Sequence, residues 1–238
     1  MTSDQDFYRD GYMCMPFEAA KLAGLVQTLC VPPKPHYERG FSWDSKYKNT
    51  FDFRPSPIKY DRAFVDVLFE NNIDKLIEEA TLTRDIELVH CQVRYVERPD
   101  VNNTSYMAWH RDTYLTKDGW VGNTPPVNKL ILYFEQGDPS HKLAVVRGSH
   151  RRMYDCQDMD CSKLLTSDAD IFTFMSTPNT GIFFNTAILH HVIPEQKPQG
   201  SIRVIYSFAT SQQFEKNYSR DNIHRECNSQ YKKLRGAR

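Results

Sequence analysis

From about residue 85 onward, short apolar runs alternate with turn-forming residues, and this pattern limits the possible fold more than any other feature. Residues 86–96 alternate in polarity and are rich in β-branched and aromatic side chains, as expected of a strand. Further runs of this kind are residues 129–134, 143–146, 171–174, 181–184 and 202–208. Many short strands separated by turns are typical of an antiparallel barrel or a jelly roll.

The first third of the chain is expected to be mainly helical. Residues 17–30 have a helix-forming composition and are followed by Pro32 and Pro33, and residues 60–80 place apolar side chains at roughly helical spacing. Residues 34–57 are aromatic and rich in turn formers, so we expect an ordered loop there. Helices followed by strands indicate an α+β protein whose N-terminal helices buttress a double-stranded β-helix, the cupin-like jelly roll.

The length of 238 residues suits one large domain better than two. Within it we expect helical support in residues 1–84, the jelly-roll core in residues 85–210, and a basic C-terminal segment in residues 211–238. Because this last segment is rich in Lys and Arg, we interpret it as a solvated or frayed terminus.

Composition and charge give no support to several classes of protein. With 30 basic and 30 acidic residues the formal net charge is zero, so nothing global indicates a nucleic acid or an anionic membrane as partner. No apolar run is long enough to span a bilayer, and the N-terminus lacks the basic and apolar regions of a signal peptide, which predicts a cytoplasmic protein. The six cysteines form no CxxC pair, so neither a zinc ribbon nor a disulfide framework is indicated.

His110 and Asp112 are two residues apart, and His190 and His191 follow far downstream. Two histidines and one carboxylate form the facial triad that holds non-haem Fe(II) and leaves coordination positions open for a co-substrate and O₂. If residues 110–112 are extended, His110 and Asp112 point to one side and Arg111 to the other. Neighbouring side chains on a strand diverge, so only one of His190 and His191 is expected to bind the metal.

Arg203 follows the downstream histidines within a β-rich run. A guanidinium group at this place could clamp a carboxylate through two parallel hydrogen bonds. The co-substrate 2-oxoglutarate has a distal carboxylate that needs such a partner. The metal pair, the distal histidine and the arginine, in this order, therefore favour an oxygenase.

At four places the chain resembles the Fe(II)/2-oxoglutarate dioxygenase superfamily, and most closely its phytanoyl-CoA-hydroxylase-like branch. Gly11-Tyr12 with Pro16 is similar to the opening "DGY…P", and residues 109–112 to the "WHxD" iron motif. Residues 143–150 are similar to the "vvPGSH" segment, although Arg147 replaces the usual proline. Residues 181–208 are similar to the closing strands, which include an "HxVxP" pattern beginning at His190.

The resemblance implies a role for several residues. His110, Asp112 and His190 would bind iron, and Arg203 would hold the distal carboxylate of 2-oxoglutarate. Gln92 and Lys129 match further positions that contact the co-substrate in relatives. Ile205 departs from the pattern, because relatives often have Ser or Thr two residues after the arginine.

The implied activity is hydroxylation of a small-molecule substrate with release of succinate and CO₂, using Fe(II), 2-oxoglutarate and O₂, with ascorbate as a possible addition in vitro. Three alternatives stay open. The chain could be a catalytically inactive jelly-roll binding or scaffold protein, a cupin-like metal protein that does not use 2-oxoglutarate, or a member of the superfamily that modifies nucleic acid or protein.

Overall fold

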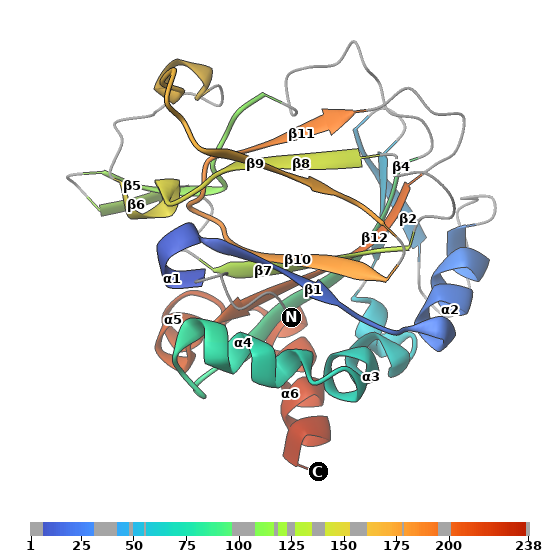
Figure 1. Ribbon diagram of the computed structural model, residues 1–238. Helices are drawn as coiled ribbons and strands as arrows, with labels where there is room; N and C mark the ends of the chain where they lie inside the picture. The colour runs from blue at the N-terminus through green and yellow to red at the C-terminus, as the bar shows by residue number, and fades with distance from the viewer. Residues whose placement is uncertain are drawn as a thin grey trace.

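The computed structural model describes residues 7–30, 42–47, 50–54, 56–96, 108–116, 119–122, 127–134, 141–152, 161–177, 179–194 and 201–236, and the structural statements below apply to these residues. Two antiparallel sheets face each other, as Figure 1 shows, and helices cover the outer face of the larger one. The expected α+β jelly-roll architecture is therefore confirmed. In the described part of the chain the two sheets are not hydrogen-bonded to each other, so the jelly roll is open rather than a closed barrel.

The larger sheet has seven strands within the described residues. In spatial order they are β1 (Tyr12–Pro16), β10 (Thr180–Asn185), β7 (Asn128–Tyr133), β12 (Ser201–Ala209), β4 (Glu87–Val96), β3 (Thr50–Arg54) and β2 (Ser42–Tyr47). The smaller sheet consists of β11 (His190–Pro194), β8 (His141–Val146) and β9 (Ile171–Met175), and β5 (Thr113–Thr116) forms a separate hairpin with β6 (Gly119–Gly122). All six strand runs expected from the sequence after residue 85 are present.

The core has two layers, one on each face of the larger sheet. Val204 and Tyr206 on β12 are fully buried against the helices, whereas Ile205 between them packs toward the smaller sheet. This is the alternation of a strand covered on both faces. The layer between the two sheets includes Ile131 from β7 and Val145 from β8.

The helical first third differs from expectation in two respects. The predicted single helix over residues 60–80 is wrong: the chain forms α3 (Ala63–Glu70) and α4 (Ile73–Thr81), and Asn72 between them adopts a left-handed backbone with φ of 52°. Asparagine tolerates this conformation better than most residues, so a pattern of apolar spacing cannot reveal the break. The helix predicted over residues 17–30 is present as the shorter α2 (Ala20–Cys30), and a four-residue helix, α1 (Phe7–Asp10), precedes it.

The first 84 residues, expected to be mainly helical support, also supply strands, because β1, β2 and β3 all belong to the larger sheet. Within the loop expected over residues 34–57, residues 42–47 and 50–54 instead pair as the strands β2 and β3, and β3 pairs with β4. Residues 34–41, 48, 49 and 55 of that expected loop lie outside the described residues. Asp52 in β3 is 1% exposed and accepts hydrogen bonds from Arg94 at 2.7 and 3.0 Å. A buried aspartate disfavours a strand unless a distant partner compensates its charge, and that partner lies outside any local window.

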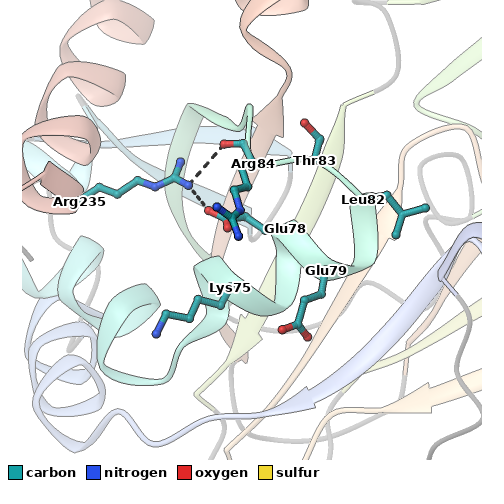
Figure 2. A pocket seen from close by; sticks show the side chains of 7 residues that line it. All are labelled: Lys75, Glu78, Glu79, Leu82, Thr83, Arg84 and Arg235. Atoms are coloured by element: carbon teal, nitrogen blue, oxygen red, sulfur yellow. Dashed lines mark hydrogen bonds and ion pairs between the residues drawn. The ribbon is translucent and has the colours of Figure 1, made fainter.

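The basic C-terminal segment is not a frayed terminus. It forms α5 (Ser211–Asn217) and α6 (Asn222–Gly236), of which α6 packs on β4 and α3. Cys227 and Tyr231 are 2% and 1% exposed, and the Tyr231 ring stacks on Phe69 with centroids 5.5 Å apart. Figure 2 shows Arg235 of α6 reaching Glu78 of α4 and the backbone oxygen of Arg84. Basic side chains line the exposed face of an amphipathic helix whose other face is core.

Candidate metal centre

Hydrogen bonds between distant segments bring the predicted metal ligands together. His110 and His190 form an isolated antiparallel bridge, in which each backbone N–H donates to the other residue's carbonyl oxygen at 2.9 Å. The backbone N–H of Asp112 donates to the Thr186 carbonyl at 3.1 Å, just before β5 begins at Thr113. Both contacts connect the segment around residue 110 to the end of β10 and the start of β11.

His110, Asp112 and His190 each offer one ligand atom, and these atoms all lie within 4.8 Å of one another. In the described part of the chain this is the one group of three or more His, Cys, Asp or Glu residues close enough to hold a metal ion. Arg111 points away from the group, as the alternation predicts, and donates to the carbonyl oxygens of Ser149 at 2.7 Å and Arg152 at 3.1 Å.

The two adjacent downstream histidines have different surroundings. The His190 side chain is 6% exposed, and its Nε2 atom lies 3.9 Å from Oδ2 of Asp112. His191 lies outside the group of three, and its ring stacks on Trp109 with centroids 5.3 Å apart. The structure therefore groups His190, rather than His191, with the upstream pair.

Both histidines of the group are oriented by backbone carbonyls. Nδ1 of His110 lies 2.7 Å from the Ala108 oxygen, and Nδ1 of His190 lies 2.9 Å from the Ile188 oxygen. A carbonyl oxygen only accepts hydrogen bonds, so each Nδ1 carries a proton and donates it. In a neutral imidazole this leaves the lone pair on Nε2, which is how metal-binding histidines are commonly held.

The local electrostatics favour a neutral imidazole and an ionised carboxylate. Burial, together with the neighbouring His110, lowers the pKa of His190 to about 4. Burial would raise the pKa of the Asp112 carboxyl, but the Lys129 ammonium and the two histidines hold it well below its usual value. Nζ of Lys129 lies 2.7 Å from Oδ2 of Asp112. Neutral imidazoles and a carboxylate are the forms that bind metal.

Arg203 and Gln92, the other predicted co-substrate residues, lie on the same sheet face as Lys129. Where β12 pairs with β7, Ser207 lies opposite Lys129 and Arg203 lies opposite Tyr133. Where β12 pairs with β4, Ile205 lies opposite Gln92. Because opposite residues and every second residue share a face, all three candidates point toward the layer between the sheets. Lys129 contacts the group of three directly, whereas Arg203 lies about 13 Å further along the strands, estimated from the rise per residue.

Three hydroxyl residues around the group were not among the candidate site residues predicted from the sequence. Thr113 and Thr186 are 2% and 1% exposed, and their Oγ1 atoms lie 3.0 Å apart. Ser149 is 1% exposed and accepts a hydrogen bond from the backbone N–H of Leu189 at 2.8 Å. Their partners are between 40 and 73 residues away, so no local pattern could find them.

By sequence, the chain matches no protein-family model and no curated protein. Solved structures with a similar fold include the epimerase SnoN in complex with Fe³⁺, alpha ketoglutarate and nogalamycin RO. It is 12% identical, and the match covers 87% of this chain and 81% of SnoN with a TM-score of 0.63. EvdO2 from Micromonospora carbonacea var. aurantiaca is 13% identical over 86% of this chain and 89% of its own, with a TM-score of 0.59.

HygX from Streptomyces hygroscopicus, with nickel and 2-oxoglutarate bound, is 12% identical over 86% of this chain and 85% of its own, with a TM-score of 0.58. The chain has the fold of non-haem, 2-oxoglutarate-dependent enzymes. Identities this low establish the fold alone. Within that fold, the group of His110, Asp112 and His190 is the part of the described structure with the donor set of a metal site.

A hollow outside the candidate metal centre, drawn in Figure 2, is lined by charged side chains of α4 and α6, including Lys75, Glu79 and Arg235. These helices lie on the face of the larger sheet that is opposite the smaller sheet (Figure 1).

Among the described residues, none of the helices combines the length and the apolar character that crossing a bilayer demands.

Proposed function

We propose that this protein is a non-haem Fe(II)- and 2-oxoglutarate-dependent oxygenase that hydroxylates a small-molecule substrate and releases succinate and CO₂. One observation carries the proposal: in a fold shared with 2-oxoglutarate-dependent enzymes, His110, Asp112 and His190 converge within 4.8 Å. On the motif resemblance, we further propose that the chain belongs to the phytanoyl-CoA-hydroxylase-like branch.

The three residues fit a ferrous ion by the chemistry of their donor atoms. Two imidazoles whose Nδ1 atoms already donate to backbone carbonyls, and one ionised carboxylate, form a facial set of ligands for Fe(II). Such a set occupies one side of the ion and leaves the other side for the co-substrate and O₂. When bound, iron and 2-oxoglutarate would supply the oxidising chemistry, and the protein would supply position and exclusion of water.

We propose that Arg203, Gln92 and Lys129 bind 2-oxoglutarate. Arg203 is 6% exposed on the face between the sheets, where its guanidinium group could hold the distal carboxylate. Nε2 of Gln92 is buried without a hydrogen-bond partner among the described residues, so it could donate to a ligand. Ile205, opposite Gln92, supplies no hydroxyl group. The Lys129 ammonium could pair with a carboxylate of the co-substrate beside the iron.

A small-molecule substrate is supported by the complexes solved for proteins of this fold. SnoN has been solved with nogalamycin RO, and HygX with hygromycin B. The formal net charge of zero in this chain offers no general attraction for nucleic acid. Among the structural neighbours are an epimerase and a carbocyclase, SnoN and SnoK, so the fold accommodates outcomes other than hydroxylation. The mass of the product distinguishes them, because hydroxylation adds one oxygen atom, ring closure removes two hydrogens and epimerisation leaves the mass unchanged.

The decisive experiment measures succinate formation from 2-oxoglutarate with Fe(II), ascorbate and a panel of small metabolites. Substrate-stimulated succinate release by the wild-type protein, and none by Asp112→Ala, is the expected result. Binding of metal without succinate release would favour the inactive scaffold, and turnover without 2-oxoglutarate would favour a cupin-like metal enzyme. Steeply salt-dependent binding of single-stranded DNA or RNA would favour a nucleic-acid substrate.

A further inference from the structure

Thr186 lies between the segment that carries Asp112 and the strand that carries Lys129. It follows β10 directly and is 1% exposed. Its carbonyl oxygen accepts hydrogen bonds from the backbone N–H of Asp112 at 3.1 Å and of Thr113 at 3.3 Å. The backbone of Thr186 therefore fixes the point at which the carboxylate side chain leaves the chain.

The Thr186 side chain has every hydrogen-bonding position filled. Its Oγ1 donates to the Val127 carbonyl at 2.7 Å and accepts from the Val127 N–H at 3.1 Å. Since the single hydroxyl proton is used on Val127, the contact of 3.0 Å with Thr113 is one in which the Thr113 hydroxyl donates. One donor and two acceptor positions are all that a hydroxyl group offers, and all three are satisfied in a buried environment.

These contacts form a closed circuit around the carboxylate. Val127 precedes Lys129 by two residues, and Nζ of Lys129 lies 2.7 Å from Oδ2 of Asp112. The path from Asp112 to its neighbour Thr113, through the Thr186 hydroxyl group to Val127 and on to Lys129, thus returns to Asp112. We propose that Thr186 is a positioning residue, whose hydroxyl group sets the Asp112 carboxylate relative to Lys129 and His190 and thereby sets the affinity of the site for a divalent metal. This role rests on the proposed function.

The physical basis is the cost of removing a buried hydrogen-bonding partner. Valine has nearly the shape of threonine but leaves the Val127 N–H and the Thr113 hydroxyl without their acceptor. Val127, which directly precedes β7, and Thr113, which directly follows Asp112, then lose their connection through this side chain. Outer partners that orient metal ligands typically change metal affinity or activity by about 10- to 100-fold when removed.

The test compares Thr186→Val with Thr186→Ser by titration with Mn²⁺, followed by calorimetry or by electron paramagnetic resonance. We expect the valine variant to bind Mn²⁺ at least about tenfold more weakly. The serine variant keeps the hydroxyl group and should keep the wild-type affinity. Equal affinity in the valine variant and the wild type would overturn the proposal.

A control separates positioning from general loss of stability. Tyr206→Phe removes another buried hydroxyl, which donates to the Phe64 carbonyl at 2.7 Å on the helical side of the sheet. Each variant should lower the melting temperature, by about 2–4 °C for each kcal/mol lost. Only the Thr186 variant should weaken Mn²⁺ binding, and equal weakening in both would contradict a specific role.

Two further outcomes are informative. If the valine variant does not fold, Thr113→Val gives a milder test, because it removes the hydroxyl donor to Thr186 and leaves Val127 bonded. Weaker Mn²⁺ binding by that variant supports the proposal, and unchanged binding overturns it. If wild-type protein binds no Mn²⁺, the proposed function itself is wrong, which is a different result from a loss confined to the variants.

Discussion

At the scale of single residues, the contacts of each histidine ring distinguish a candidate metal ligand from a histidine outside the group. His190 and His191 are adjacent, yet one ring faces Asp112 and the other stacks on Trp109. The difference follows from the divergence of neighbouring side chains on β11. Hydrogen bonds to the backbone carbonyls of Ala108 and Ile188 then fix the tautomers of the two imidazole rings in the group. Residue type alone therefore does not distinguish His190 from His191.

Substitution of each downstream histidine tests this assignment. His190→Ala should abolish measurable Mn²⁺ binding, because it removes one of three ligands. His191→Ala should leave binding close to that of the wild type, since this ring packs on Trp109 outside the group. Calorimetric titration measures both. If His191→Ala abolished binding and His190→Ala did not, the assignment of His190 would be wrong.

Arg203→Ala tests the co-substrate role. We expect the concentration of 2-oxoglutarate at half-maximal succinate formation to rise by roughly 10- to 100-fold, the loss associated with a hydrogen bond to a charged group. Mn²⁺ affinity in the absence of 2-oxoglutarate should stay unchanged, because Arg203 is remote from the three ligands. An unchanged 2-oxoglutarate requirement would point instead to Lys129 as the carboxylate partner.

At the scale of secondary-structure elements, the C-terminal helix shows how composition misleads. The basic residues of α6 suggest a solvated tail, but its other face supplies Tyr231 and Cys227 to the main core. Asn228 also accepts a hydrogen bond from the backbone N–H of Leu88 at 3.2 Å, which attaches the helix to β4. A window of composition averages the two faces of a helix, whereas the fold separates them.

Tyr231→Ala should therefore destabilise the whole protein. We expect a loss of about 3–5 kcal/mol, as for other large buried aromatic side chains, because a cavity opens between α6, Phe69 and Phe208. Lys233→Ala, on the exposed face of the same helix, should change stability by less than about 0.5 kcal/mol. Urea unfolding measures both, and a neutral Tyr231→Ala would restore the interpretation of a frayed terminus.

At the scale of the whole molecule, the N-terminal segment joins the two sheets. β1 pairs with β10 of the larger sheet, and the Asp10 carbonyl accepts from the backbone N–H of Gly148, two residues after β8 of the smaller sheet ends. The Asp10 carboxylate is 1% exposed and lies 2.7 Å from Arg9 and 3.4 Å from Arg147. Hydrogen bonding to Arg9, against the opposing effect of burial, lowers the pKa of Asp10 below 3.8.

This shift makes the stability of the protein depend on pH in a defined direction. A carboxyl group whose pKa is lower in the folded state stabilises fully above its unfolded value, and that contribution disappears as pH falls through the folded value. Asp10→Asn should cost about 1.5–3 kcal/mol at pH 7, the range for hydrogen bonds to charged groups. The difference from the wild type should shrink below about pH 4.

Urea unfolding at pH 7 and at pH 3 measures this difference. Glu79→Gln, at an exposed carboxylate on α4, is the control for the loss of one negative charge. A difference between Asp10→Asn and the wild type that is as large at pH 3 as at pH 7 would show that Asp10 contributes by packing and not by its charge.

Periodicity and spacing were enough to predict the six later strands, the jelly-roll architecture, and the placement of His110 and Asp112 on one side with Arg111 on the other. All of these depend on residues within a few positions of one another, where the period of a strand is fixed by backbone geometry. The hairpin around Asp52, the division between α3 and α4, the docking of α6 and the choice of His190 could not be derived in this way. The hydrogen bonds of the Thr186 side chain could not be derived in this way either, because their partners lie 59 and 73 residues away. Each depends on a compensating contact between distant segments, and such a contact exists only once strand order and register are set.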